Sequence, residues 1–227
     1  MQKLIKKIYK INYIYNKIFK ENFKKKLEFD WTNKLTRSEI INKIIKKKNY
    51  KTYLEIGCFE DENFNKIKIE KKIGVDPVSG GTVRSTSDEF FLSNKFFFDI
   101  IFIDGLHIYE QVKKDIQNSL KFLNSDGIIL LHDCAPLKIR DQMVPRSHEA
   151  WYGDTWKAIV ESRTLKELDT YTLLADNGIG VILKNKNKKI LNLNIKNFKK
   201  LKFKDYYYNF TDFMNPIEVD EFLLSFD

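Results

Sequence analysis

The chain has 227 residues, of which 43% are hydrophobic and 14% aromatic, so its composition excludes a disordered protein and suits one α/β domain with an appendage. Its formal charge of +9 is uneven, because residues 1–50 carry 15 Lys and Arg against 4 Asp and Glu, whereas the remainder carries 25 against 27. A nucleic-acid enzyme places basic surface around its active site, and near neutrality beyond residue 50 therefore makes nucleic acid a disfavoured partner.

The cysteine count and the hydropathy pattern bear on the compartment. Cys58 and Cys134 are too few for a disulfide framework, which predicts reduced thiols. Lysines interrupt the apolar positions of the first 25 residues, and no stretch reaches the length of a transmembrane helix. We therefore expect a cytoplasmic protein.

The first predicted element is a basic amphipathic helix over residues 3–24. Lysines occupy one side of this helix, and apolar residues recur on the other side at three- and four-residue spacing. The apolar residues are Leu4, Ile8, Ile11, Tyr15 and Ile18. We expect the apolar stripe to pack on the domain or on a second copy of the chain in a homodimer. Alternatively, residues 1–25 contact the anionic inner face of a membrane. Residues 1–35 are accordingly treated as a helical extension.

The next elements alternate between helix and strand. Thr36 to Glu39 is a capping-box pattern that begins a helix ending in Lys46 to Lys48. Short β-branched runs then predict buried strands at Thr52–Ile56, Ile73–Val75, Ile100–Ile103 and Ile128–Leu131. A weak further strand is expected before Ser87, and a helix from Tyr109 to Leu123. This alternation indicates an α/β fold with a doubly wound, Rossmann-like and mostly parallel sheet.

The end of the predicted domain departs from parallel pairing. Tyr171–Leu174 and Ile179–Leu183 flank an Ala-Asp-Asn-Gly turn, which predicts an antiparallel hairpin. We place the domain at residues 36–185, followed by a C-terminal tail over residues 186–227 with a short helix at Glu218–Phe226.

Two acidic strand ends indicate a nucleoside site. Glu55 and Gly57 follow the first strand, and Asp76 ends the second strand 21 residues after Glu55. In doubly wound sheets such a glycine allows close approach of a ligand, and such an acid binds the ribose hydroxyls. The turn lacks G-x-G-x-x-G, and acidic residues around it would repel a pyrophosphate. A cationic, phosphate-free nucleoside is favoured, and S-adenosylmethionine carries both a sulfonium and an ammonium.

The ordered set of motifs resembles the class I S-adenosylmethionine-dependent methyltransferases, and more narrowly their small-molecule and sugar O-methyltransferase branch. It covers about residues 36–185 and consists of Glu55-x-Gly57, Asp76, Ser87-Asp88, Asp104 to His107, and His132-Asp133. The resemblance implies a seven-stranded sheet with a C-terminal hairpin. It further implies that Glu55 and Gly57 lie along the methionine part of the cofactor, Asp76 on the ribose, and Ser87 and Asp88 near the adenine. Cys58 and Asp104 are expected as further cofactor contacts. The second and third glycines of the usual loop are Phe59 and Asp61 here.

The predicted reaction centre lies at the next two strand ends, where Asp104 and Asp133 should meet at one edge of the sheet. A hydroxyl acceptor has to lose its proton, so we expect His107 as general base, His132 as the second choice, and Asp104 beside them. The alternative is a divalent cation such as Mg²⁺ bound by Asp104, His132 and Asp133.

A long segment from Ala135 to Arg163 follows the last parallel strand, and loops of this length are usually functional. Aromatic rings stack on sugars and arginines bind phosphate or carboxylate, so we expect acceptor contacts from Trp151, Tyr152, Arg140 and Arg146. Asp154 is predicted to cap a helix at Thr155–Ser162.

The sequence therefore predicts a methyltransferase that uses S-adenosylmethionine to methylate a hydroxyl of a small polar acceptor, such as a sugar or glycan precursor. Two alternatives stay open: a nucleic-acid methyltransferase, and a membrane-associated methyltransferase-like protein without catalysis. The first lacks the Asn/Asp-Pro-Pro-aromatic run that base methyltransferases place after the fourth strand, and the retained strand-end acids argue against the second.

Overall fold

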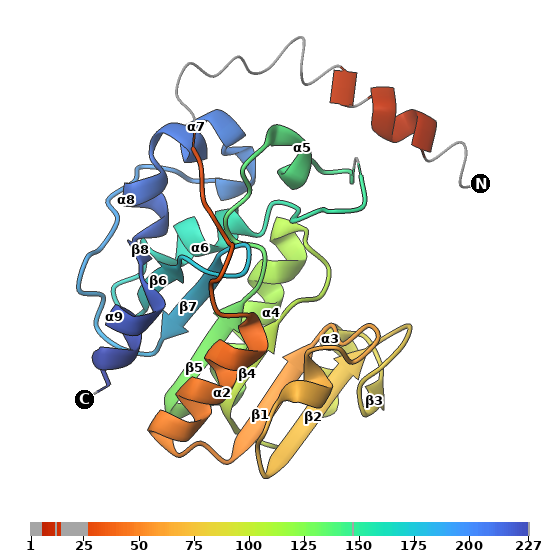
Figure 1. Ribbon diagram of the computed structural model, residues 1–227, viewed down its shortest axis with the longest axis vertical. Coiled ribbons are helices and arrows are strands. Elements are labelled where there is room, and N and C mark those ends of the chain that lie inside the picture. Colours follow the sequence, from red (N-terminus) through yellow and green to blue (C-terminus); the bar gives the residue numbers. More distant parts are fainter. Residues whose placement is uncertain (1–5, 12, 15–26, 147, 227) are drawn as a thin grey trace.

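A computed structural model describes residues 6–11, 13–14, 27–146 and 148–226 (Figure 1). Among these residues the strands form one eight-stranded sheet in the order β3-β2-β1-β4-β5-β7-β6-β8. They are β1 (Thr52–Ile56), β2 (Lys71–Asp76), β3 (Val83–Arg84), β4 (Phe98–Ile103), β5 (Leu123–Leu131), β6 (Asp169–Leu173), β7 (Ile179–Leu183) and β8 (Pro216–Ile217). The helices are α2 (Arg37–Lys48), α3 (Ser87–Ser93), α4 (Tyr109–Phe122), α5 (Ile139–Gln142), α6 (Trp156–Ser162), α7 (Phe203–Tyr208), α8 (Phe210–Met214) and α9 (Val219–Leu224), with single 3₁₀ turns η1 (Phe64–Lys66) and η2 (Phe198–Lys200).

The sheet topology confirms the expected doubly wound fold. Strands β3, β2, β1, β4 and β5 pair in parallel, whereas β7 runs antiparallel to both β5 and β6. The sheet has one strand more than the expected seven because β8, from the C-terminal tail, pairs in parallel with β6. The chain leaves β1 toward one edge and returns through β4 toward the other, so the carboxyl ends of these two strands form the topological switch point at which ligands bind in such folds.

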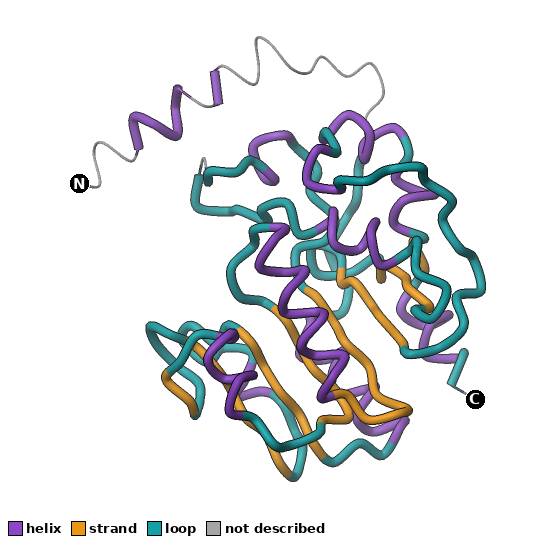
Figure 2. The backbone as a smooth tube through the Cα atoms, turned by 180° about the vertical axis from the view of Figure 1, so that it is seen from behind, coloured by secondary structure: helices purple, strands orange, loops and turns teal. Residues whose placement is uncertain are grey.

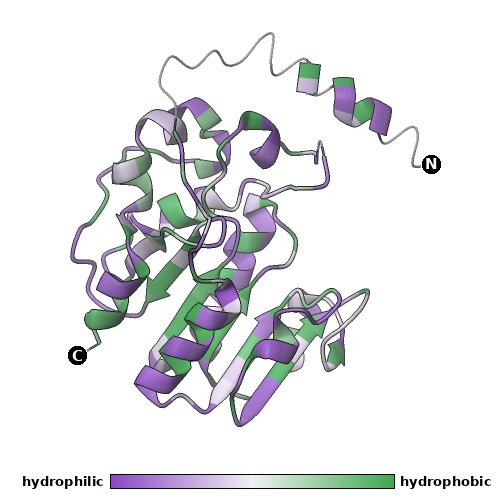
Figure 3. Cartoon of the chain, viewed as in Figure 1, coloured by the Kyte–Doolittle hydropathy of each residue, from purple (hydrophilic) through white to green (hydrophobic). Residues whose placement is uncertain are grey.

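Side-chain alternation along the strands divides the core into two layers. Leu54 and Ile101 face a cluster with α3, α4 and α6, whereas Tyr53 and Phe102 face a cluster with α2 and α9. Figure 2 shows α4 lying across the sheet on the face opposite to α2. Both faces of the sheet are therefore covered, which explains the continuous hydrophobic colouring of the central strands in Figure 3.

Helix α2 begins at the predicted capping box. Glu39 Oε2 accepts hydrogen bonds from the Thr36 amide and hydroxyl, each at 2.8 Å, and the helix ends where Asn49 adopts a left-handed conformation with φ of 54°. Four buried isoleucines pack the helix on the sheet, namely Ile40, Ile41, Ile44 and Ile45. Burial of each side chain stabilises the fold by about 1.5–3 kcal/mol. Because α2 precedes β1 and runs antiparallel to it, its N-terminal residue, Arg37, lies at the ligand-binding edge.

The C-terminal tail packs into both layers of the core. Phe203 and Tyr206 join the cluster around α6, and Phe222 joins the cluster under α2. Residues 27–31 cross over α7 and α8, where the Phe29 and Phe210 ring centroids are 4.7 Å apart. The tail is therefore part of the folded unit.

The N-terminal extension is described only in part. Residues 6–11 and 13–14 are helical, whereas the rest of the predicted helix over residues 3–24 lies outside the described residues. Ile8 and Ile11, the described residues of the predicted apolar stripe, are 46% and 58% exposed, so these two side chains are not buried against the domain. Among the residues the structure covers, no helix is long and apolar enough to cross a membrane.

Candidate active site

A cavity of about 580 Å³ opens at the carboxyl ends of β1, β2 and β4. Its volume is within the range of small-molecule sites. It is lined by Ile56, Gly57, Phe59, Val75, Asp76, Pro77, Val78, Thr86, Ser87, Asp88, Asp104, Gly105, Leu106, Gln111 and Asp115. Five of the predicted cofactor residues, Gly57, Asp76, Ser87, Asp88 and Asp104, therefore line a single cavity.

Gly57 is required where β1 passes β4. Its φ is +87°, and a Cβ there would lie 2.4 Å from the Asp104 carbonyl oxygen. The next turn retains left-handed backbone at the two positions where the family's loop has glycine, since φ is 48° at Phe59 and 62° at Asp61. The turn thus keeps the backbone shape of a glycine-rich loop with bulkier side chains. Asp61 supports it by accepting the Gly81 amide at 2.6 Å.

Asp76 organises two turns with one carboxylate. Its Oδ2 accepts the amides of Cys58 at 3.1 Å and Phe59 at 3.0 Å, and its Oδ1 accepts those of Val78 at 2.8 Å and Ser79 at 2.9 Å. Burial by itself raises the pKa of this carboxyl, but the four amides outweigh it and hold the pKa below its usual range. Asp76 is therefore an ionised group that lines the cavity and fixes its two rims.

The far end of the cavity carries a polar cluster from α3 and α4. Asp115 Oδ1 accepts the Ser87 hydroxyl at 2.6 Å and the Gln111 amide at 3.1 Å, and the same amide nitrogen is 3.1 Å from Asp88 Oδ1. Burial raises the pKa of Asp115 to about 6. Ser87 and Asp88 were predicted from sequence, whereas Gln111 and Asp115 were not, because on α4 they look like ordinary polar helix residues.

Glu55 and the Cys58 thiol are not among the cavity-lining groups. The Glu55 carboxylate accepts hydrogen bonds from the Tyr53 hydroxyl and from Asn63 Nδ2, the latter at 2.9 Å, and burial raises its pKa to about 7. The Cys58 thiol is buried, which raises its pKa, and the residue contributes its backbone amide to Asp76. Both residues support the cavity wall from behind.

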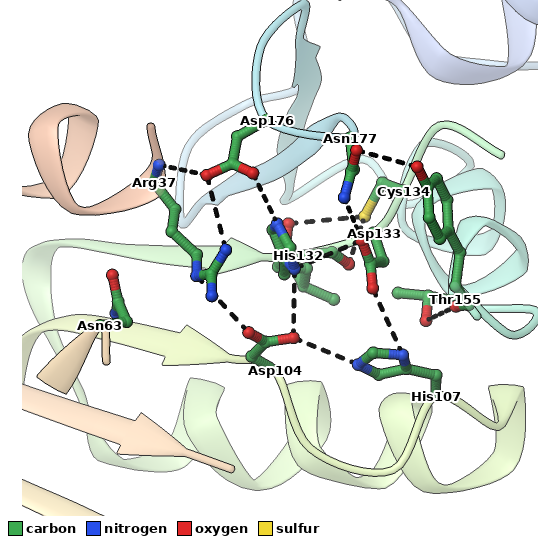
Figure 4. Close-up of polar contacts among 12 residues, drawn as sticks. Arg37, Asn63, Asp104, His107, His132, Asp133, Cys134, Thr155, Asp176 and Asn177 are labelled. Carbon is green, nitrogen blue, oxygen red and sulfur yellow. Dashed lines mark hydrogen bonds and ion pairs between the residues drawn. The ribbon is translucent and has the colours of Figure 1, made fainter. Parts of the chain in front are cut away.

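Beside the cavity, Asp104, His107 and Asp133 converge (Figure 4). His107 Nε2 is 3.2 Å from Asp104 Oδ1, and His107 Nδ1 is 3.5 Å from Asp133 Oδ2 and 3.1 Å from the Trp151 carbonyl oxygen. Each of the three side chains offers one ligand atom, and these atoms lie within 4.8 Å of one another. Within the described chain, the group able to hold a metal thus contains His107, where the sequence suggested His132.

His132 is held between two carboxylates. Its Nδ1 is 3.2 Å from Asp104 Oδ1, and its Nε2 is 3.2 Å from Asp176 Oδ1. Asp176 also accepts the Arg37 amide at 2.5 Å and lies 3.7 Å from the Arg37 guanidinium. Asn177, next in the chain, donates to Asp133 at 3.1 Å. His132 is therefore buried, with a carboxylate facing each of its ring nitrogens.

The charges of this network shift one another. Burial lowers the pKa of His107 and of His132, but the facing carboxylates outweigh it and raise both pKa values, that of His132 strongly. Burial by itself raises the pKa of Asp104, whereas the two histidines hold it well below the usual range. Burial raises the pKa of Asp133 despite its histidine neighbours. The carboxylates thus stabilise a proton on either imidazole ring, and the histidines stabilise the negative charge of Asp104.

The segment after β5 folds back onto this network. The Trp151 ring centroid is 5.7 Å from that of His107, and the Tyr152 hydroxyl donates to Asn177 at 2.8 Å. The prediction that Asp154 caps the following helix is wrong. Its Oδ1 instead accepts the amide of Tyr109, the first residue of α4, at 2.6 Å, because tertiary folding brings the segment to that helix end.

Arg140 and Arg146 lie apart from the cofactor cavity. They line a second cavity of about 800 Å³, together with Lys6, Tyr9, Lys10, Tyr13, His148, Glu149 and Ala150. The Arg146 guanidinium is 5.8 Å from the Trp151 ring, so this basic cavity adjoins the reaction centre through that tryptophan. Of the four predicted acceptor residues, Arg140 and Arg146 therefore line the second cavity, whereas Trp151 and Tyr152 lie at the acid–histidine network.

Comparisons with known proteins agree with this geometry. Residues 54–134 match a family model described as a methyltransferase domain. The fold is similar to a Klebsiella pneumoniae protein described as an O-methyltransferase (12% identity, TM-score 0.51, covering 77% of this chain and 95% of that one). It is also similar to the S-adenosylhomocysteine-bound methyltransferase PaMTH1 of Podospora anserina (16% identity, TM-score 0.50, 66% and 78% coverage) and to cofactor-bound Rv0187 from MTB (13%, 0.50, 69% and 84%). No curated protein matches the chain.

At these identities the solved structures establish the fold alone. The family model matches the segment that runs from β1 to just after β5. That segment contains Gly57, Asp76, Asp104 and Asp133, and thus the cavity and the neighbouring acids. The chain therefore contains a segment that matches a methyltransferase domain, within a fold similar to that of solved methyltransferases.

Proposed function

We propose that the protein transfers the methyl group of S-adenosylmethionine to a hydroxyl oxygen of a small polar acceptor, with a sugar or glycan precursor as the preferred class. The observation that carries this proposal is the double position of Asp104, which lines the nucleoside cavity and also hydrogen-bonds His107 of the acid–histidine cluster. A methyl donor in the cavity and a hydroxyl at the cluster would meet at this residue.

The cavity fits the cofactor in size and in charge. Gly57 leaves room at the end of β1, Asp76 stands at the end of β2, and Ser87 with Asp88 lines the far end. When bound, S-adenosylmethionine supplies an electrophilic methyl group on a positively charged sulfur. The ionised Asp76 and Asp104 suit that positive charge, and they would oppose the pyrophosphate of a dinucleotide.

The cluster supplies the proton acceptor that a hydroxyl needs. Displacement at a methyl group requires the attacking oxygen to be held in line and to lose its proton. In our proposal, the hydroxyl proton goes to the His107 ring, and Asp104 and Asp133 stabilise the resulting imidazolium. His132 takes a positioning role here, because both of its nitrogens face carboxylates.

The same three side chains also fit a divalent cation. Two carboxylates and an imidazole are a donor set for such ions, so Asp104, His107 and Asp133 would hold one, and a bound cation lowers the pKa of a coordinated hydroxyl. Mn²⁺ titration monitored by electron paramagnetic resonance separates this case from catalysis by His107 alone. Saturable Mn²⁺ binding that Asp133→Asn abolishes supports the metal.

The surroundings of the cluster favour a polar acceptor with an anionic group. Trp151 presents a partly exposed ring beside His107, which suits stacking on a sugar. The basic cavity behind it, with Arg140, Arg146 and two lysines, suits a phosphate or carboxylate on the same acceptor.

The exposed stripe of the N-terminal helix supports a second role, peripheral contact with an anionic membrane. Ile8, Ile11 and Ile14 are exposed on a helix that carries Lys6, Lys7 and Lys10. Co-sedimentation with vesicles containing phosphatidylglycerol should be lost when Ile8 and Ile11 are changed to Asn. A homodimer covering the same residues would instead show as a concentration-dependent mass by light scattering, and it would contradict the membrane role.

Two measurements test the main proposal. Isothermal calorimetry should detect S-adenosylhomocysteine binding to the wild type, and failure at millimolar concentration would contradict cofactor use. Transfer of labelled methyl groups to a panel of monosaccharides, sugar phosphates and nucleotide sugars then tests the acceptor. His107→Gln should bind S-adenosylhomocysteine like the wild type while losing transfer, because His107 does not line the cofactor cavity.

A further inference from the structure

The basic cavity of about 800 Å³ lies between two segments that are far apart in the sequence. The N-terminal helix, over residues 6–11 and 13–14, forms one wall. The segment after β5 forms the other wall with Arg140, Arg146 and residues 148–150. A volume of this size is within the range of small-molecule sites, so the two walls enclose room for a ligand.

The N-terminal helix lines this cavity with its polar side. Its four cavity-lining residues recur at three- and four-residue spacing, which places them on one side of a helix. They are Lys6, Tyr9, Lys10 and Tyr13. Ile8 and Ile11 lie on the opposite side and are exposed. Burial of these two isoleucines therefore does not hold the helix at the cavity, and the lysine and tyrosine side is left to do so.

The cavity has an excess of positive charge. Its described lining contains two lysines, two arginines and a single carboxylate, that of Glu149. Burial lowers the pKa of His148, and the positive charges of Arg140 and Arg146 add to this effect despite the nearby Asp141. Like charges on facing walls repel each other, and an anion between them replaces this repulsion by attraction. The cavity therefore suits an anionic group.

The number of cationic side chains favours a diphosphate over a carboxylate. A carboxylate carries one negative charge, whereas a diphosphate that links two groups carries two. Arginine binds phosphate oxygens in pairs of hydrogen bonds, and lysine binds them as a point charge. Arg146 is already fixed at the wall, because its Nε donates to the His148 carbonyl oxygen at 2.7 Å and a second guanidinium nitrogen donates to that of Glu149.

Trp151 connects the basic cavity to the acid–histidine cluster. The Arg146 guanidinium is 5.8 Å from the Trp151 ring, and the ring centroids of Trp151 and His107 are 5.7 Å apart. A single indole thus spans the space between the cavity and the proposed base. A monosaccharide lying alongside Trp151 would place a hydroxyl near His107 and its anionic substituent near Arg146.

We propose that the acceptor is a diphosphate-linked sugar, and that its diphosphate binds between the N-terminal helix and the two arginines of the basic cavity. This assignment rests on the proposed function and deepens it, since it names the anionic group and adds Lys6 and Lys10 to the acceptor site. The same diphosphate occurs on nucleotide sugars and on sugars carried by polyprenyl lipids. With a lipid carrier, the exposed Ile8 and Ile11 would lie toward the membrane.

Calorimetry on the full-length protein tests the cavity with inorganic diphosphate. The wild type should bind it saturably, and Lys10→Gln should weaken binding roughly 10-fold, as expected for loss of one charge-assisted hydrogen bond. Lys7→Gln is the matched control, because it removes the same charge from an exposed position of the same helix that does not line the cavity. Its affinity should equal that of the wild type. No saturable binding, or equal losses in the two variants, would overturn the proposal.

Two probes with the same sugar distinguish the sources of the diphosphate. UDP-N-acetylglucosamine is soluble, whereas undecaprenyl-diphosphate-linked N-acetylglucosamine is offered in phosphatidylcholine vesicles. Binding of either one that Lys10→Gln weakens and Lys7→Gln does not supports the proposal and identifies the source. Binding of inorganic diphosphate alone would show a site for an inorganic anion only, and would overturn it. Glucuronate, which has a carboxylate instead, should bind more weakly than the diphosphate probe, and equal affinity would also overturn the proposal.

Binding of S-adenosylhomocysteine, measured in parallel, separates this proposal from the proposed function. If the wild type binds S-adenosylhomocysteine but none of the diphosphates, methyl transfer stands and the acceptor assignment is overturned. If it binds a diphosphate but not S-adenosylhomocysteine, the proposed function fails, while the basic cavity stands as a diphosphate site.

Discussion

Replacing Asp76 by Asn tests how the cavity rims are built, independently of any ligand. The carboxylate accepts four backbone amides, those of Cys58 and Phe59 after β1 and those of Val78 and Ser79 after β2. An Asn side chain keeps one acceptor oxygen and replaces the other by an NH₂ donor. Two of the four amides would then face a donor.

The expected loss follows from these contacts. A buried donor left unsatisfied costs about 1–3 kcal/mol, and three of the four bonds are only partly buried, so we expect a loss of about 3 kcal/mol in the free energy of unfolding. For a chain of this size, that corresponds to a melting temperature lower by roughly 6–12 °C. The pKa of Asp76 is lowered in the fold. Its contribution is therefore present above the unfolded pKa of about 4 and is lost as the pH falls through the folded pKa.

Urea unfolding at pH 7, followed by circular dichroism, measures the effect without cofactor. Asp88→Asn is the matched control, because Asp88 lines the same cavity but accepts only from the Gln111 and Lys114 side chains. We expect its change to stay below about 1 kcal/mol. If Asp76→Asn unfolds at the same urea concentration as the wild type, the four-amide account of this carboxylate is refuted. A loss of S-adenosylhomocysteine binding in an Asp76 variant has to be interpreted together with this stability measurement.

Three further outcomes are expected. Gly57→Ala should cost about 3 kcal/mol and abolish S-adenosylhomocysteine binding, because φ is +87° and the new Cβ would meet the Asp104 carbonyl oxygen at 2.4 Å; a wild-type melting temperature would contradict this. Burial raises the pKa of Asp115 to about 6, so its contribution to stability is present below about pH 4 and is lost as the pH rises through 6. Asp115→Asn should therefore gain up to about 3 kcal/mol on the wild type between pH 4 and pH 8 in urea titrations, and a constant difference would count against the buried acid. Mn²⁺ should bind the wild type and not Asp133→Asn, whereas Asp212→Asn, on α8, should bind it normally.

Much of the fold could be predicted because its signals are local. The capping box at Thr36, the β-branched runs of the strands and the Ala-Asp-Asn-Gly turn each specify a backbone conformation through neighbouring residues. Strand β8 could not be predicted in this way. Pro216 and Ile217 form a strand only because the tail returns to the edge of β6, and two residues carry no periodicity.

Those site residues could be predicted that directly follow a parallel strand. Asp104 and Asp133 end adjacent strands, and the topology alone brings them together. Arg37 and Asp176 were missed because they belong to a helix start and a hairpin turn. A signal existed for Asp176, since β6 runs in the same direction as β5, so the turn after it lies at the same edge. Asp154 looked like a cap for the next helix, but it accepts the Tyr109 amide instead. This contact depends on tertiary packing, which no local sequence pattern contains.

The charge of the site gives a reason why cavity and cluster share Asp104. Methyl transfer to a hydroxyl removes one positive charge from the cofactor's sulfur and releases one proton from the acceptor. If His107 takes that proton, the positive charge passes from one side of Asp104 to the other, because this carboxylate lines the cavity and also lies 3.2 Å from the His107 ring. The surrounding acids then face the same net charge before and after reaction. A site arranged in this way needs little reorganisation during the chemical step, which is the condition under which fixed charges contribute most to catalysis.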